Sequence, residues 1–388
     1  MLYVGGGWTF LGCLPSSCHG LVTKLGEKLI AIWCTRGFAG LRCLIMVDIR
    51  EILQRLQAGE SLDEVAAHRF FSAMLEGQIE VGQVAAALAL MATRVPSEDE
   101  LVAGAKVMRA SVTMVPVAAG MSGNIVDTCG TGGTPKTFNV GTLAAIVAAA
   151  AAPGVVRVAK HGNRSRTGRG SAEVLAGLGV NVHASPAVQA RCLAETGVCF
   201  CFAIHHHPAM KHVAPVRQAL GFPTIFNAMG PLTNPAGATR QVMGVYRREL
   251  VLPVAKTLAR LGCERAWVLH SEDGLDELTV SSPVFVAEVQ GQQVTEWKFE
   301  ATRLGMAKAS VESLQAWDLE DAVAIARRLL DGEKGPKRDM LLLAAAAALV
   351  VGGGASDMAR GLEMAGGAID SGAAARTLAQ LAAVSHGA

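Results

Sequence analysis

The sequence predicts an α/β protein in which a small N-terminal α-helical domain precedes a larger α/β domain with a mostly parallel central sheet. Apolar residues recur at helical spacing from Val47 to about Val112, whereas short β-branched runs alternate with Ala-rich helical runs after Asn124. Strands that alternate with helices favour a parallel sheet covered on both faces. A chain of 388 residues is long enough for one small and one large domain.

Residues 46–115 form the predicted helical domain. Gly59 ends its first helix, and Ser61 with Glu64 three residues later predicts a capping box for the second. Ser97 and Glu100 predict a second capping box. The helices after the first are expected at Val65–Leu75, Val81–Thr93 and Glu98–Ser111.

Residues 120–388 form the predicted α/β domain. Its strands are expected at Asn124–Thr128, Val155–Ala159, Val198–Ile204, Gln241–Tyr246 and Ala266–His270, followed by a hairpin over Pro283–Phe299 that turns at Gly291. The intervening helices are expected at Thr142–Ala152, Ser171–Leu178, Pro186–Thr196, Pro208–Leu220 and Leu250–Leu261. The C-terminal part returns to helix.

The first 45 residues differ from the rest of the chain. They are rich in glycine and cysteine, and their first basic residue is Lys24, so the positive start of a secretory signal is missing. A helical pattern begins abruptly at Met46. We therefore expect residues 1–45 to be a non-native or disordered leader, with an unusual targeting leader as the alternative.

Bulk composition excludes several classes of protein. The net charge of +2 creates no field that would attract nucleic acid or an acidic membrane surface. No apolar run reaches the roughly 18–20 residues of a membrane span. The nine cysteines show no paired zinc-ligand spacing, which is typical of free thiols in a cytoplasmic protein.

The chemistry is predicted where the strands end, because ligands of open parallel sheets bind beyond the carboxyl ends of the strands. The first strand leads into the Gly-rich stretch CGTGGTPKTFNVGT. It is not a nucleotide P-loop, because Pro135 precedes the lysine where that motif has glycine. Its backbone N–H groups and the helix that follows still form a phosphate-binding arrangement.

Charges in two later loops indicate a phosphorylated ligand and a metal. The loop after the second strand carries cations at Lys160, Arg164, Arg166 and Arg169, and the loop after the fifth carries carboxylates at Asp273, Asp276 and Glu277. Cations beside carboxylates predict a phosphate held partly through Mg²⁺, which takes one or two carboxylates plus phosphate oxygens. Three adjacent histidines, His205 to His207, were expected to point in alternating directions and not to share an ion.

Four motifs in this order resemble the anthranilate phosphoribosyltransferase family: GTGG…TFNVGT, KHGNR…GSAEVL, HHPAMKHVAPVRQALGFPTIFNAMGPLTNPAG and DGLDE. The similarity runs from about Met46 to the C-terminus, and the segment from His206 to Gly237 is its most specific part. It implies an enzyme of tryptophan biosynthesis, with anthranilate and phosphoribosyl diphosphate as substrates and Mg²⁺ as metal. It also implies a homodimer formed through residues 46–115, with helices around 208–235 packed on that domain.

The resemblance also implies the site residues. Those for phosphoribosyl diphosphate are Gly130, Gly133, Thr134, Thr137, Asn139, Val140, Gly141, Thr142, Lys160, His161, Gly162, Asn163 and Arg164. Those for anthranilate are Gly130, Asn163, His207, Arg217, Gly230 and Pro231. The metal ligands are Asp276 and Glu277, and His161 is a candidate proton acceptor whose alternative role is a structural bond to the backbone.

The sequence departs from the family pattern on the phosphate side. Thr134 stands where members usually have Asp, and Gly141 stands where they have a metal-binding Ser. The turn from Arg166 to Arg169 replaces a Ser-rich turn, and its arginines are expected to supply part of the missing electrostatic role. These changes are expected to alter the metal number and diphosphate affinity while leaving the anthranilate side nearly unchanged.

Two other functions share parts of this sequence pattern. A pyrimidine-nucleoside phosphorylase has a phosphate-side loop similar to TGRGSAEVL, but Arg217 and the HHPAMKH segment argue against it. A non-catalytic branch that binds nucleic acid is favoured by the altered metal positions and opposed by the near-neutral charge and the intact DGLDE.

Overall fold

The computed structural model describes residues 2–4, 7–9, 48–121, 124–133, 137–165 and 168–387. The chain divides into two units, Met1–Met46 and Val47–Ala388. In the first unit, β1 (Leu2–Val4) pairs antiparallel with β2 (Gly7–Thr9). The rest of residues 1–45 lies outside the described residues, so a non-native or disordered leader there stays a prediction.

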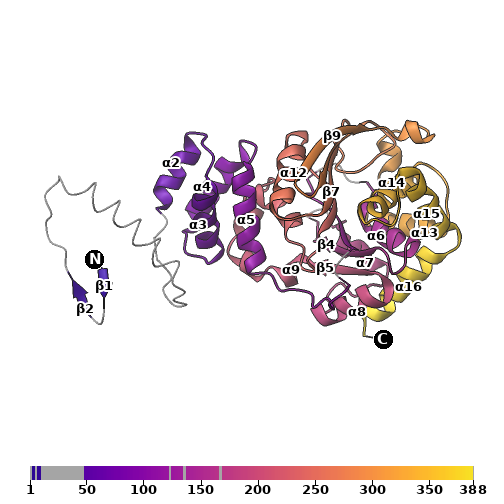
Figure 1. The fold of residues 1–388 in the computed structure, drawn as a ribbon, viewed down its shortest axis with the longest axis horizontal. Helices are drawn as coiled ribbons and strands as arrows, with labels where there is room; N and C mark the ends of the chain where they lie inside the picture. Colours follow the sequence, from indigo (N-terminus) through magenta and orange to yellow (C-terminus); the bar gives the residue numbers. More distant parts are fainter. Residues whose placement is uncertain are drawn as a thin grey trace. The chain divides into compact units, whose positions relative to one another are not determined.

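The second unit begins with four helices, drawn in indigo in Figure 1: α2 (Ile49–Gln57), α3 (Glu64–Leu75), α4 (Val81–Ala92) and α5 (Glu98–Ala110). Phe70, Phe71 and Leu88 are fully buried among them. The predicted Ser61–Glu64 capping box is wrong. Asp63 caps α3 instead and accepts the Ala66 N–H over 2.9 Å, because its own backbone is extended just before the first helical residue.

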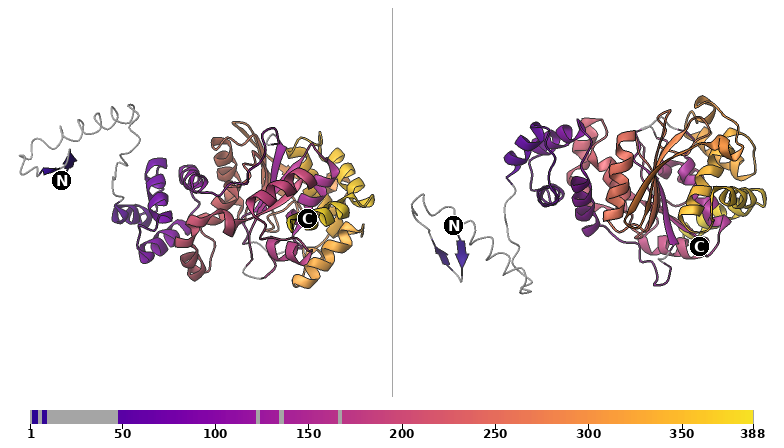
Figure 2. Two further views of the ribbon diagram at one scale, coloured as in Figure 1. Left: turned by 90° about the horizontal axis from the view of Figure 1, so that it is seen from below. Right: turned by 45° about the horizontal axis from the view of Figure 1, so that its top comes forward.

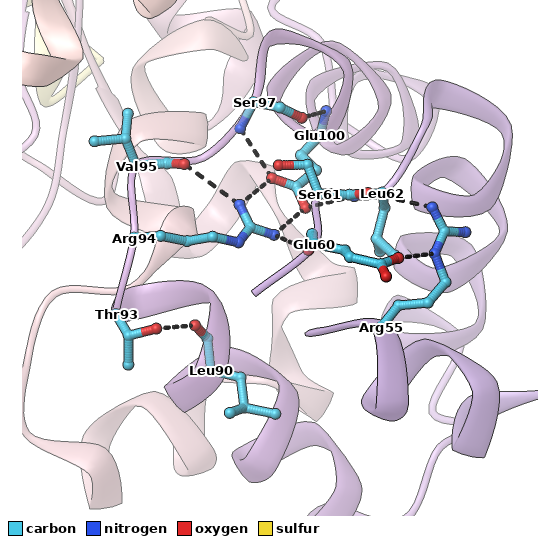
Figure 3. Close-up of polar contacts among 10 residues, drawn as sticks. All are labelled: Arg55, Glu60, Ser61, Leu62, Leu90, Thr93, Arg94, Val95, Ser97 and Glu100. Carbon is cyan, nitrogen blue, oxygen red and sulfur yellow. Dashed lines mark hydrogen bonds and ion pairs between the residues drawn. The ribbon is translucent and has the colours of Figure 1, made fainter. Parts of the chain in front are cut away.

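Glu100 stabilises the helical unit from a position with no solvent exposure (Figure 3). The predicted capping box is confirmed, since the Ser97 hydroxyl accepts from the Glu100 N–H and the Glu100 carboxylate accepts from the Ser97 N–H. The carboxylate also accepts the Leu62 N–H over 3.0 Å and two Arg94 nitrogens at 2.5 and 2.8 Å. One carboxylate therefore joins the start of α5 to the segments before α3 and after α4.

The α/β part contains a seven-stranded sheet of order β5-β4-β3-β6-β7-β8-β9. Its first five strands in that order pair parallel, and β8 and β9 form an antiparallel hairpin with Gly291 in the turn. This confirms the predicted mostly parallel sheet. The strands are β3 (Ile125–Gly130), β4 (Arg157–Gly162), β5 (Val198–Phe202), β6 (Arg240–Gly244), β7 (Arg265–Ser271), β8 (Val284–Gln290) and β9 (Gln293–Phe299).

Two predicted boundaries near the site were wrong. The second strand runs to Gly162 and not to Ala159, so Lys160 and His161 are strand residues that pair with Phe200 and Cys201 of β5. The polar groups of these two side chains have partners at the edge of the sheet. The polarity of the residues along the chain does not reveal those partners.

Further along, the strand predicted to Ile204 ends at Phe202, and α9 (Ala203–His206) follows. The helix predicted over Pro208–Leu220 is split into the 3₁₀ turn η3 (Pro208–His212) and α10 (Ala214–Leu220). Pro215 lacks the N–H that would extend a continuous helix through this point.

Helices cover both faces of the sheet (Figures 1 and 2). One core joins the sheet to α6, α14 and the C-terminal helices, and a second core runs from α2–α5 through α11 to α12 and the other sheet face. In that second core α10 contacts α4 and α11 contacts α5. Besides α9 and α10, the helices of the α/β part are α6 (Val140–Ala151), α7 (Ser171–Gly177), α8 (Pro186–Thr196), α11 (Ile225–Met229), α12 (Val251–Arg260), α13 (Leu319–Leu330), α14 (Pro336–Val351), α15 (Met358–Asp370) and α16 (Ala373–Ser385). Within the described ranges, no helix has the length and apolar character needed to cross a membrane.

Candidate active site

Gly130 and Gly244 end neighbouring parallel strands and make room for the acidic turn. The two glycines are register partners in β3 and β6. A Cβ atom on Gly244 would lie 1.7 Å from the backbone oxygen of Asp276, and one on Gly130 would lie 2.7 Å from Asp276 Oδ2. Gly244 is therefore required while the Asp276 backbone keeps this place, whereas a Cβ atom at Gly130 would meet only the end of the Asp276 side chain, which can rotate away. The Gly-rich loop and the acidic turn, far apart in sequence, meet here.

Thr137 joins the Gly-rich loop to the second carboxylate. Its hydroxyl donates to Glu277 Oε2 over 2.6 Å, and the Gly141 N–H also favours the ionised form of Glu277. Burial and the neighbouring Asp276 nevertheless raise the pKa of Glu277 to about 7. Two adjacent carboxylates are costly without a nearby cation, so this pair suits a divalent ion.

Lys160 is a buried cation facing these carboxylates. Its side chain is 5% exposed, and its ammonium group donates to the Thr128 carbonyl. Burial lowers the pKa of Lys160, while Asp127, Glu277 and Asp276 oppose that change by their charge. One ammonium group beside three carboxyl groups leaves an excess of negative charge when all are ionised.

Gly141 lies against the same contact. A Cβ atom at this position would come within 3.2 Å of the Thr128 carbonyl oxygen and 3.7 Å of Lys160 Nζ. The Gly141 carbonyl in turn accepts from the Thr128 hydroxyl over 2.8 Å. A larger residue would therefore press on the Thr128 carbonyl oxygen, the acceptor of the Lys160 ammonium group, while its contact with Lys160 itself would be of ordinary length.

Asp127 fixes the end of β4 through hydrogen bonds. It has no solvent exposure and accepts from the His161 N–H at 3.0 Å and from Asn234 Nδ2 at 2.8 Å. Asn234 also donates to the Ala159 carbonyl over 2.8 Å. Burial raises the pKa of Asp127 to about 6 despite these donors. Asn234 belongs to a quoted motif but was given no role from sequence.

Asn139 links the Gly-rich loop to the loop that follows β4. Its backbone has a φ of 64°, in the left-handed region, and its side chain donates to the Arg169 carbonyl over 3.0 Å. The Arg169 guanidinium donates to the Ala316 carbonyl. Thr142 contacts the Ser171 hydroxyl at 3.0 Å. The extra arginines are expected to supply charge to the site. For Arg169, this role has to be compatible with the bond that its guanidinium group makes to the Ala316 carbonyl.

His161 and His207 face each other within the site. Their Nε2 atoms are 3.2 Å apart, and Thr233 Oγ1 is 3.5 Å from His207 Nε2 while it donates to the Gly230 carbonyl. Burial lowers the pKa of His207 to about 4 and that of His161 well below its usual value. Both rings are neutral near pH 7. Because its pKa is so low, His161 is a weak base. This favours a structural role for His161 over the role of proton acceptor.

Arg217 approaches the Gly-rich loop through one intermediate residue. Its guanidinium donates to Asn227 Oδ1 over 3.2 Å and lies 5.6 Å from the centre of the Phe226 ring. Asn227 Nδ2 donates to the Thr131 carbonyl over 3.1 Å. Burial lowers the pKa of Arg217, and none of the described carboxylates forms an ion pair with it. An unpaired, half-buried guanidinium suits a planar carboxylate ligand.

The remaining candidates divide between the edge of the site and its frame. Asn163 and Arg164 are exposed, and the Arg164 guanidinium lies over Phe202 at 5.6 Å. The others shape the backbone around the site. Gly133 packs near Pro223 and Tyr246, and Gly162 packs against Phe200, whereas a Cβ atom at Gly230 would contact nothing. Val140 is the first residue of α6, and the Pro231 carbonyl accepts from Gln241. Thr134 and Arg166 lie outside the described residues.

The three adjacent histidines have different partners. His205 Nε2 is 2.9 Å from His183 Nδ1, and His206 Nδ1 is 2.6 Å from the Thr113 carbonyl, while His207 faces His161. Across the described ranges, no group of three or more His, Cys, Asp or Glu side chains is arranged to hold a metal ion. A metal at the Asp276–Glu277 pair would thus need further oxygen ligands from a bound substrate or water.

Two family models match the two parts of this chain. Residues 122–375 match the model of a glycosyl transferase family α/β domain, and residues 50–112 match that of its helical bundle domain. The anthranilate phosphoribosyltransferase of Rhodospirillum rubrum is 45% identical over 87% of this chain and 96% of its own length. That of Parvibaculum lavamentivorans is 44% identical over 88% and 99%.

The chain belongs to the anthranilate phosphoribosyltransferase family. A crystal structure of the Thermus thermophilus member has a TM-score of 0.79 at 38% identity, covering 86% of this chain and 99% of its own. The Saccharomyces cerevisiae member shares the fold at a TM-score of 0.78, with 22% identity over 88% of this chain and 98% of its own.

Within this anthranilate phosphoribosyltransferase fold, sequence reasoning missed Gly244, Asn227 and Thr233. Gly244 had one available indication, because it is a glycine inside the predicted strand Gln241–Tyr246, where close backbone approach is a common cause. Asn227 and Thr233 lie within the most specific motif, yet only their contacts to Arg217 and His207 indicate a role.

The buried His207 gives this protein a pH-dependent stability. Its folded-state pKa of about 4 is below its usual 6.5, so its contribution is present above pH 6.5 and is lost as the pH falls toward 4. Between pH 7 and pH 5 we expect His207 to account for a loss of about 2 kcal/mol in the free energy of unfolding. Urea denaturation at the two pH values measures it.

A matched variant isolates this contribution from other groups. The raised pKa of Asp127 acts in the opposite direction, since protonation of its carboxyl group relieves the cost of burial, and His161 acts in the same direction as His207. In His207→Gln the loss between pH 7 and pH 5 is expected to shrink by about 2 kcal/mol. An identical loss in the variant and the unmodified protein would contradict the assignment.

Proposed function

We propose that this protein transfers the phosphoribosyl group from 5-phosphoribosyl 1-diphosphate to anthranilate, giving N-(5-phosphoribosyl)anthranilate and diphosphate. The observation that carries the proposal is the meeting of Gly130, Gly244 and Asp276 beside the α6 N-terminus and Glu277. Both relatives have the same enzyme name, anthranilate phosphoribosyltransferase, and the match covers nearly their whole length. This favours the transferase over a nucleoside phosphorylase or a nucleic-acid-binding protein.

The reaction breaks one bond and forms another at C1′ of the ribose. The C1′–oxygen bond breaks and its electron pair leaves with the diphosphate, while the amine nitrogen forms the new C1′–N bond and then gives its proton to the departing diphosphate or to water. An aromatic amine is already neutral near pH 7, so the reaction needs no strong base. The protein therefore contributes mainly by positioning the two substrates and by stabilising the departing charge.

The phosphate side is assigned to the Gly-rich loop and the start of α6. The backbone N–H groups around Gly141 in the first turn of α6, together with Lys160, are proposed to bind diphosphate oxygens. The residues proposed for this side are those that the resemblance implied, from Gly130 to Thr142 and from Lys160 to Arg164. Removing one such donor typically raises a barrier by about 2.7–4 kcal/mol.

Asp276 and Glu277 are proposed to hold Mg²⁺. The excess of carboxylate over ammonium groups around Lys160 supports a divalent cation here, and the Saccharomyces cerevisiae relative was solved in complex with PRPP and Mg. When bound, Mg²⁺ supplies charge neutralisation to the diphosphate. Asp276 and Glu277 contribute its protein oxygens, and Thr137 orients Glu277.

The anthranilate side is assigned to Arg217, His207, Asn163, Gly230 and Pro231. The unpaired Arg217 guanidinium is proposed to bind the substrate carboxylate. Arg217→Ala is expected to raise the KM for anthranilate by about tenfold or more, because a charge-assisted bond of roughly 1.5–3 kcal/mol is lost. The KM for phosphoribosyl diphosphate should change little. Steady-state kinetics with each substrate varied in turn measures both.

Arg217→Lys tests geometry separately from charge. Lysine keeps the positive charge but loses the planar pair of donors, so its KM should lie between those of the unmodified protein and the alanine variant. Arg360→Ala provides an exposed control, since Arg360 pairs with Glu363 on α15. An unchanged KM for anthranilate in Arg217→Ala would remove this residue from the pocket.

The function itself is tested by anthranilate fluorescence. Adding phosphoribosyl diphosphate and Mg²⁺ should abolish the fluorescence as the amine is substituted, and omitting either should preserve it. Stable fluorescence with all components and folded protein would reject the proposed reaction. A salt-sensitive gel shift with nucleic acid, without turnover, would instead favour the binding alternative.

We further propose a cytoplasmic homodimer formed through residues 46–115. The resemblance to the family supports this proposal. Val65 on α3 is 61% exposed and Val81 at the start of α4 is 68% exposed, so both are accessible positions at which to test the contact. Light scattering after size exclusion should give twice the chain mass, and Val65→Lys with Val81→Lys should shift it toward the monomer.

A further inference from the structure

Glu277 occupies a position at the start of α6 that suits an anion. Its carboxylate accepts from the hydroxyl of Thr137, a residue just before α6, at 2.6 Å, and the N–H of Gly141 in the first turn of α6 favours its ionised form. Asn139, the residue that precedes this helix, makes no side-chain cap, since its amide donates to the Arg169 carbonyl. A carboxylate from a distant turn thus takes the place of a local cap.

The same N–H groups belong to the proposed phosphate-binding side. A helix N-terminus offers few unpaired donors, and a carboxylate and a phosphate oxygen use them in the same way. The Gly141 N–H cannot serve Glu277 and a phosphate oxygen fully at once. Diphosphate binding therefore competes with the contacts that Glu277 makes in the free protein.

The local charges decide when Glu277 can move. Lys160 already faces Asp127, Asp276 and Glu277, and its ammonium group donates to the Thr128 carbonyl. A displaced Glu277 without another cation would lie close to Asp276 and to the incoming phosphate. A divalent cation offers the displaced carboxylate a new partner, which removes this cost.

We propose that Glu277 makes the site selective for metal-loaded diphosphate, because its carboxylate occupies the phosphate position at the α6 N-terminus until a divalent cation binds it. This rests on the proposed function, and it adds a second role to a metal ligand. Without metal, the carboxylate excludes diphosphate from the helix terminus. With metal, the same carboxylate helps to hold the complex.

The test is calorimetric titration with inorganic pyrophosphate, in EDTA and in Mg²⁺. The unmodified protein should bind pyrophosphate much more weakly in EDTA. In EDTA, Glu277→Ala should bind pyrophosphate at least about tenfold more tightly than the unmodified protein does, because the carboxylate that competes for the same position is gone. Its gain from Mg²⁺ should shrink. Glu277→Ala with unchanged or weaker binding in EDTA overturns the proposal.

Two variants separate occupancy from simple charge repulsion. Asp276→Asn removes a neighbouring negative charge but leaves the Glu277 carboxylate at the α6 N-terminus, so its binding in EDTA should rise much less than that of Glu277→Ala. An equal rise in both would also overturn the proposal. Circular dichroism verifies that each variant is folded.

The outcomes for the unmodified protein keep the two proposals distinct. If it binds pyrophosphate with Mg²⁺ while Glu277→Ala shows no gain in EDTA, only the selectivity of Glu277 is rejected. If the folded, unmodified protein binds pyrophosphate in neither condition and leaves anthranilate fluorescence unchanged, the proposed function is rejected as well.

Discussion

Gly244→Ala is expected to reduce kcat/KM by about 100-fold or more, because misplacing catalytic groups by roughly 1 Å has an effect of that size. The new Cβ atom would lie 1.7 Å from the backbone oxygen of Asp276, so the acidic turn must move. That turn carries both proposed metal ligands and packs against Gly130. The loss should appear mainly in turnover at saturating Mg²⁺ and phosphoribosyl diphosphate, measured by anthranilate fluorescence.

Gly366→Ala is the matched control for this prediction. Gly366 lies inside α15, and a Cβ atom there would contact nothing within 4 Å. Alanine at such a helical position should raise stability by about 0.5–1 kcal/mol and leave activity unchanged. Full activity in a folded Gly244→Ala variant would mean that the acidic turn has no fixed position in the reaction.

Glu100→Ala is expected to lower the free energy of unfolding by about 3–5 kcal/mol, the usual cost of removing one partner of a buried pair. The change leaves Arg94 without its carboxylate and leaves the Leu62 and Ser97 N–H groups without their acceptor (Figure 3). Arg94 is already confined, since its side chain is 17% exposed. Urea denaturation followed by circular dichroism measures the change.

Two comparisons sharpen this second prediction. Glu363→Ala removes a carboxylate whose side chain is 71% exposed and pairs with Arg360, so its effect should be within about 0.5 kcal/mol. Glu100→Gln retains an acceptor but loses the charge and should fall between the two. If Glu100→Ala were as stable as Glu363→Ala, the buried cluster would not hold the helical unit together.

The fold class was predictable because its determinants are local. Helical spacing of apolar residues before Val112, alternation of strands and helices after Asn124, and Gly291 in a hairpin turn each depend on neighbouring residues. The Ser97–Glu100 capping box was predicted for the same reason and is confirmed. The Ser61–Glu64 box was wrong because Asp63, two residues further on, fits the helix start better.

The site was predictable as a set of strand ends but not as a set of contacts. Parallel strands bring their carboxyl ends to one edge, so the Gly-rich loop and the acidic turn were expected to meet. The boundary of β4 was missed because Lys160 and His161 are polar, and polarity resembles a loop. Only the pairing with β5 makes them strand residues.

The sequence by itself determined the order of the elements, the Gly-rich and acidic turns, and the residue types available for phosphate, carboxylate and metal. The tertiary structure alone decided that Thr137 of the Gly-rich loop bonds to Glu277, that Asp276 needs Gly244, and that Arg217 has no carboxylate partner among the described residues. The reason is physical: spacing along the chain governs helices, strands and turns, whereas charge balance and close approach depend on atoms that folding brings together from distant segments.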